Sequence, residues 1–200
     1  MVYKTLQGLS YIHKDTASAY TSIAILLFSL LKLRGERLKF SHLLIFLHVL
    51  LHAPHSIKYH AEHYLSTEEQ NLENHKKDII MIYISHIIMH IALSYEVPWA
   101  LKSITLNIFI LFTLLIIEKI EQSKTEANNM KISIGYSWIF LLHYIPIIYT
   151  NQWWFVLLHT VFYIIGFGIY TSKVIGNESI NNALMHCGII INNWFAFKFC

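Results

Sequence analysis

The sequence predicts an all-α protein, a polytopic membrane bundle of seven transmembrane helices, with six as the alternative count. Of its 200 residues, 55% are apolar or aromatic and only 14% are charged, whereas an ordinary soluble domain has about 25% charged residues. The mean hydropathy is +0.46. Nearly all acidic residues lie in the connections between long apolar runs. Too few charges remain to cover a soluble core of this size, so a soluble enzyme is disfavoured.

Length and net charge narrow the class further. Two hundred residues suit one domain, which we place over residues 1–200. Disorder is excluded because its signature is low hydrophobicity. The formal net charge is only +3 and Lys and Arg do not gather in one stretch, so nucleic acid is not an expected partner. The expected partner is the lipid bilayer, in which the chain is integral.

Seven apolar stretches approach or reach the length needed to cross a bilayer. A helix needs roughly 20 mostly apolar residues to cross hydrocarbon about 30 Å thick. In chain order the stretches are residues 17–33, 40–58, 79–93, 100–117, 132–150, 153–171 and 180–197. Short connections between helices favour antiparallel neighbours, so we expect a compact bundle.

The first two segments are bounded by charge. Segment 17–33 is an apolar run that ends at the charged turn 34–37. Segment 40–58 is followed by the polar stretch 62–78, which holds five of the twelve acidic residues. Because a charge at the middle of a bilayer is costly, both connections are expected to lie outside the hydrocarbon.

The next two segments are separated by a proline. Segment 79–93 ends before Glu96 and Pro98, and segment 100–117 begins just after them. Proline cannot continue a helix that precedes it, so the boundary is well defined. The polar stretch 118–131 then closes the fourth segment.

The last three segments are joined by short polar links. Segment 132–150 contains Pro146, which predicts a kink. Two polar residues separate it from segment 153–171, and residues 172–179 lead into segment 180–197. Tryptophans lie at or near segment ends, as in the aromatic belts of membrane interfaces; they are Trp99, Trp138, Trp153, Trp154 and Trp194.

Histidine carries the functional signal. The chain has thirteen histidines. His42 lies at the start of the second segment, and eight lie deeper inside the predicted segments: His48, His52, His55, His86, His90, His143, His159 and His186. A polar side chain at membrane depth usually faces the bundle interior. The i, i+4 and i, i+7 spacings in segments two and three place their histidines on one face of each helix. Carboxylates are absent from the segments, so a carboxylate proton relay is not expected.

Depth arithmetic suggests a metal site. If segments alternate in direction, His52, His86 and His186 fall at nearly one depth on three helices. Three imidazoles and a water form a known catalytic zinc arrangement, in which the metal makes hydroxide available near pH 7. We therefore predict zinc held by these three residues and hydrolysis of a lipid or an amide. Ser85, Asn182 or Glu96 would orient the ligands or move protons. The identity of any catalytic residue stays open.

Two alternatives to a zinc-dependent hydrolase remain open. The second tier of histidines includes His90, His143 and His159, and two of them could hold haem in a b-type cytochrome that transfers electrons. In the third interpretation the protein is a non-enzymatic receptor, channel or assembly factor. Its histidines would then serve as hydrogen bonds between helices.

Three short runs resemble a family of seven-helix membrane proteins. Residues 162–170, FYIIGFGIY, resemble the sixth-helix run of progestin and adipoQ receptors and hemolysin III proteins. Residues 182–186, NALMH, lie where that family opens its seventh helix with HxxxH, with Asn182 at the first histidine, and resemble HAxWH of alkaline ceramidases. Residues 89–98 are similar to FHxTLxY and DELPM of the same group. The resemblance implies a seven-helix, zinc-dependent amide or lipid hydrolase with a lipid substrate.

Overall fold

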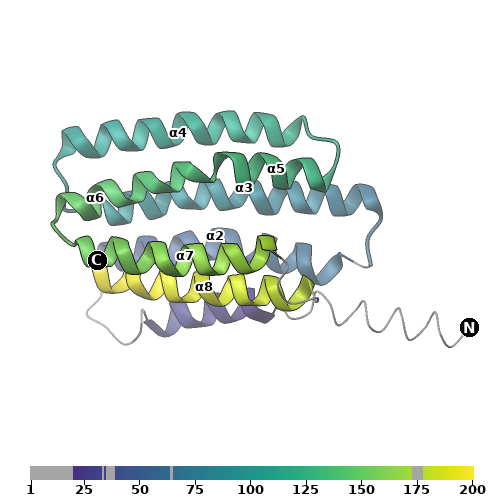
Figure 1. Ribbon diagram of the computed structural model, residues 1–200, viewed down its shortest axis with the longest axis horizontal. Coiled ribbons are helices and arrows are strands. Elements are labelled where there is room, and N and C mark those ends of the chain that lie inside the picture. Colours follow the sequence, from purple (N-terminus) through teal and green to yellow (C-terminus); the bar gives the residue numbers. More distant parts are fainter. Residues whose placement is uncertain (1–19, 33, 35–38, 64, 173–177) are drawn as a thin grey trace, which may run out of the picture.

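The computed structural model describes residues 20–32, 34, 39–63, 65–172 and 178–200, and all regular structure in them is helical. Helices lie over each of the seven apolar stretches. In order they are an initial helix Tyr20–Lys32, α2 Phe40–Glu62, α3 Glu68–Leu93, α4 Trp99–Glu121, α5 Glu126–Tyr136, the 3₁₀ helix η1 Ser137–His143, α6 Tyr144–Tyr149, α7 Trp153–Ser172 and α8 Glu178–Phe199. Successive rods run antiparallel along one axis, and α5, η1 and α6 together form a single rod (Figure 1).

Three of these rods are long and apolar enough to cross a membrane. They are α2, α4 and the combined rod Glu126–Tyr149. The stretches Tyr20–Lys32 and Trp153–Phe162 are apolar but shorter in the part of the chain that is described. Helix α3 has 26 residues, but its N-terminal third is polar. Its apolar part is therefore too short to count among the three candidate membrane-spanning helices.

Helix α3 begins eleven residues before the predicted segment, which corrects the assignment of stretch 62–78 as a connection. Thr67 is the reason, because its side chain and Gln70 form a reciprocal capping box. The Thr67 hydroxyl accepts from the Gln70 N–H at 3.2 Å, and the Gln70 side chain accepts from the Thr67 N–H at 3.0 Å. Glu68 and Glu69 in the first turn complement the positive end of the helix dipole. The early start places Asp78 inside the helix.

Proline shapes the fifth rod. Pro146 lacks an N–H and its ring would clash with the carbonyl of Leu142 in a regular α-helix. Upstream of it the backbone tightens into the 3₁₀ helix Ser137–His143, and α-helical geometry resumes at Tyr144. A 3₁₀ stretch within a longer helical rod often marks a functional position. His143 is the last residue of this stretch.

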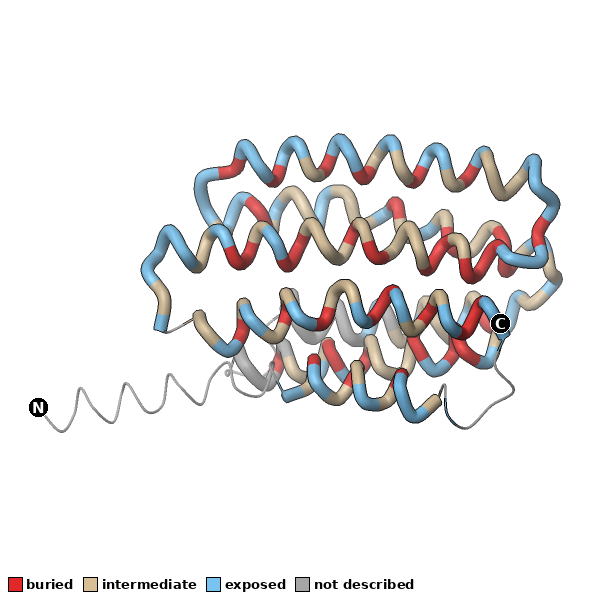
Figure 2. The backbone as a smooth tube through the Cα atoms, turned by 180° about the vertical axis from the view of Figure 1, so that it is seen from behind, coloured by how far each residue is buried: buried red, intermediate tan, exposed pale blue. Residues whose placement is uncertain are grey.

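Helix α3 lies at the centre of the bundle and packs against α2, α4, α5 and η1. Buried residues run as a stripe along the inner faces of the rods, whereas α4 turns an exposed face outward (Figure 2). That face carries Ile104, Leu111 and Leu114, which are 58–66% exposed. Large exposed apolar surfaces on a protein mark contact with a partner or a membrane. The predicted anchors Trp99, Trp153 and Trp154 are also exposed, at the end of the bundle where α4 and α7 begin.

Candidate functional site

Three histidines form a hydrogen-bonded row in the bundle interior. His86 Nδ1 lies 3.0 Å from His143 Nε2, and His143 Nδ1 lies 3.2 Å from His90 Nδ1. His90 Nε2 lies 2.9 Å from the Thr105 hydroxyl on α4. His86 and His90 share a face of α3 because they are one turn apart. The row, which we call the histidine row (His86, His143, His90 and Thr105), therefore joins α3, η1 and α4.

Both ring nitrogens of His143 are engaged, one with each neighbouring ring. The Thr105 hydroxyl lies 3.0 Å from the Leu101 carbonyl and 3.2 Å from the Lys102 carbonyl. When it donates to either carbonyl, it accepts from the Nε2–H of His90. In a row of neutral rings, His90 then accepts from His143, and His143 accepts from His86. Every bond in the row points the same way. Neutral imidazole has one donor and one acceptor nitrogen, which is what such a row requires.

Aromatic rings surround the histidine row. Phe109 is completely buried and stacks on His90 and His143, with ring centroids 5.7 and 5.1 Å apart. Phe140 lies against His86 with ring centroids 4.3 Å apart. Of the three histidines, His90 and His143 are buried and His86 is partly exposed. Hydrogen bonds are stronger in the low-dielectric surroundings of the two buried rings.

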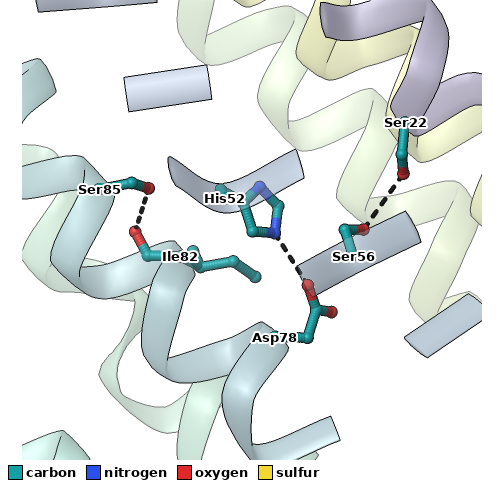
Figure 3. A network of polar contacts seen from close by, with 6 residues as sticks. All are labelled: Ser22, His52, Ser56, Asp78, Ile82 and Ser85. Atoms are coloured by element: carbon teal, nitrogen blue, oxygen red, sulfur yellow. Dashed lines mark hydrogen bonds and ion pairs between the residues drawn. The ribbon is translucent and has the colours of Figure 1, made fainter. Parts of the chain in front are cut away.

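A buried carboxylate, Asp78, lies on α3 two turns before His86, the first residue of the histidine row. Asp78 on α3 is 7% exposed, and its Oδ1 lies 3.0 Å from Nε2 of His52 on α2 (Figure 3). A buried carboxylate is costly unless it is paired and hydrogen-bonded, and His52 supplies that partner. The expectation that the segments lack an interior carboxylate is therefore corrected. Asp78 lies in the helix that the Thr67 cap extends, and not in a loop.

His48 lies between the His52–Asp78 pair and the histidine row. Its ring meets the ring of His86 edge-on, with centroids 4.6 Å apart. His48 also lines a cavity of about 20 Å³ together with His52 and His186. Asp78, His52, His48 and the histidine row thus follow one another through the interior of the bundle.

The bundle end nearer Asp78 is polar. The Tyr59 hydroxyl donates to Glu126 at 3.1 Å, and the Tyr59 ring stacks on His75 with centroids 4.8 Å apart. Burial lowers the pKa of His75, and the nearby carboxylates of Glu126 and Asp78 only partly offset that effect. Burial therefore favours the neutral form of the His75 ring.

The structure gives each residue of the predicted zinc site a different hydrogen-bond partner. His52 bonds Asp78, His86 bonds His143, and the Thr21 hydroxyl lies 2.8 Å from His186 Nδ1. His52 and His186 do line one cavity, but with His48 in place of His86. Among the described residues, no three His, Cys, Asp or Glu side chains are grouped so that they could hold one metal ion.

The other predicted site residues also lie apart from one another. Of the haem alternative, His90 and His143 are adjacent, whereas His159 bonds the Tyr144 hydroxyl at 2.8 Å. The Ser85 hydroxyl donates to the Ile82 carbonyl (Figure 3), and Glu96 lines a separate cavity toward the opposite end. The side chain of Asn182 lies outside the described residues.

Two participants were missed by sequence reasoning. The helical position of Asp78 could have been predicted from the sequence. Thr67-x-x-Gln70 matches the capping-box pattern that is typical of a helix N-terminus. The role of Thr105 could not have been predicted, because the sequence of an apolar helix does not show whether a threonine faces lipid or a histidine.

Comparison with family models, with curated protein sequences and with solved structures finds no match to this chain.

Proposed function

We propose that this chain is an integral membrane protein that conducts protons along Asp78, His52, His48 and the histidine row. One observation carries the proposal: His143 uses both ring nitrogens, each toward another imidazole. A proton that arrives on one nitrogen of such a ring can leave from the other. A mononuclear metal site would take one nitrogen from each ring, so this geometry favours a relay.

The length of the path supports a role across the membrane. Asp78 and His90 are twelve residues apart on α3, and a rise of 1.5 Å per residue separates them by about 18 Å along the bundle axis. This is more than half of a hydrocarbon layer about 30 Å thick. A polar cluster lies beyond Asp78, and Thr105 lies two turns inside the aromatic end of α4.

The arrangement of the helices supports an integral bundle of seven. The apolar outer face of α4 suits lipid, and exposed tryptophans at one end suit a membrane interface. The histidines and Asp78 face one another inside, as polar groups at membrane depth are expected to do. The zinc-dependent hydrolysis and the haem suggested by the sequence stay predictions, and the geometry favours neither over the relay.

Alkaline carbonate should leave the protein in the membrane pellet. The reason is that carbonate strips proteins held by charge but does not extract helices held by apolar burial. The measurement is the fraction of the chain in pellet and supernatant after carbonate washing of expressing cells. Recovery mainly in the supernatant would contradict both the bundle in the membrane and the conduction that depends on it.

Replacing His143 with glutamine should reduce proton flux at least tenfold. Glutamine can still donate and accept hydrogen bonds, but its amide does not take up a proton near neutral pH. The measurement is the initial rate of pH change in proteoliposomes that hold a pH-sensitive dye, driven by a potassium diffusion potential. Protein-free liposomes give the baseline.

A matched control comes from a second buried histidine outside the path. His42 on α2 is 5% exposed and packs against Phe197, with ring centroids 5.7 Å apart. The His42→Gln variant should retain the wild-type flux. If both variants conduct equally, or if wild-type flux equals the baseline, the proposed function is wrong. Size-exclusion profiles in detergent verify that both variants are folded.

A further inference from the structure

The cavity of about 20 Å³ lies among the initial helix, α2 and α8. Its lining includes His48, His52 and Ser56 from α2 and Asn193 from α8. Ser56 is already paired, because its hydroxyl lies 3.1 Å from that of Ser22 on the initial helix (Figure 3). A cavity needs about 10–15 Å³ to hold one water molecule, so this space suits one small polar ligand.

Two lining atoms are buried and lack a hydrogen-bond partner among the described residues. They are His48 Nδ1 and Asn193 Nδ2, on side chains that are 5% and 3% exposed. Most buried polar atoms in proteins are hydrogen-bonded, either to protein or to ordered water. One of these atoms belongs to an amide donor and the other to a ring nitrogen that can accept. A ligand that both accepts and donates would satisfy the two together.

We propose that this cavity binds one water molecule, which accepts from the Asn193 amide and donates to His48 Nδ1. The water site is derived from the cavity and its lining, and its role rests on the proposed function. In that role the water lies between His52, which holds Asp78, and His48, which contacts His86. It receives a proton from the His52 ring as it gives one of its own to His48, so the number of protons is conserved.

The direct test is a structure at a resolution that shows ordered water. The expected result is a density peak in the cavity at hydrogen-bond distance from His48 Nδ1 and Asn193 Nδ2. Absence of density would overturn the water site, whatever the flux. A peak about 2.1 Å from nitrogens of His52 and His186 would indicate a metal ion, which also overturns it.

The functional test fills the cavity. Val49 lines it, and a Val49→Ile variant adds one methyl group, which competes with the water. Asn193→Leu is a second variant of similar size that removes the amide. Both should lose the density peak and at least tenfold in proton flux. Val97→Ile makes the same change at a buried position outside the lining, and should retain both.

The outcomes separate this inference from the proposed function. Flux near the wild-type rate in a variant that has lost the peak would overturn the relay role of the water. If the wild-type protein shows the peak and no flux above protein-free liposomes, the proposed function fails and the water site stands. If Val49→Ile does not fold, Asn193→Leu decides the question.

Discussion

Replacing His52 with alanine is expected to destabilise the protein by about 3 kcal/mol. The loss comes less from the missing ring than from Asp78, which would be left as a buried carboxylate without its partner. Breaking a buried ion pair by removing one member typically costs about 3–5 kcal/mol. The lower end suits this pair because His52 retains partial exposure. The measurement is the free energy of unfolding in detergent micelles.

A second variant identifies the cause. Removing the carboxylate as well, in His52→Ala with Asp78→Leu, should recover much of the lost free energy of unfolding, because no buried charge remains. Such a cycle isolates the coupling between two residues in contact. His55→Ala, one turn further along α2 at a partly exposed position, should cost little. Equal losses for His52→Ala and His55→Ala would contradict the stabilising role of the His52–Asp78 hydrogen bond.

Replacing Phe109 with alanine is expected to cost about 3–5 kcal/mol, the usual range for a fully buried phenylalanine. Phe109 is completely buried between α3 and the fifth rod, where it stacks on His90 and His143. The truncation leaves a cavity beside the histidine row that water can enter. Proton flux should therefore fall together with stability, because the row loses its defined geometry.

The matched control is one turn away on the same helix. Phe112 is partly buried and packs edge-on against Trp138, with ring centroids 4.8 Å apart. Phe112→Ala removes the same atoms at a less enclosed position and should cost clearly less free energy of unfolding. If the two variants unfold at the same denaturant concentration, the burial of Phe109 against His90 and His143 does not contribute the expected extra stability.

The expected effects of His52→Ala and Phe109→Ala depend on which residues contact each other across helices. Contacts of this kind were the part of the structure that the sequence predicted least well. The i, i+4 spacing correctly grouped His86 with His90 on one face of α3. It could not identify the facing residue, because periodicity gives the direction of a side chain around a helix axis and not its height along it. The predicted depth of each histidine was counted from the midpoint of its segment. Helix α3 starts eleven residues earlier than predicted. That change moves its midpoint by about five residues, or about 8 Å along the axis.

The sequence by itself determined the helical class, the positions of the apolar stretches and the concentration of histidine inside them. These properties follow from composition and from the 3.6-residue period, which are local. Only the tertiary structure decided that Asp78 is interior, that His52 pairs with it, and that His143 lies between His86 and His90. The physical reason is that a hydrogen bond needs two atoms within about 3 Å. An error of one helical turn in the register between two rods is already 5.4 Å.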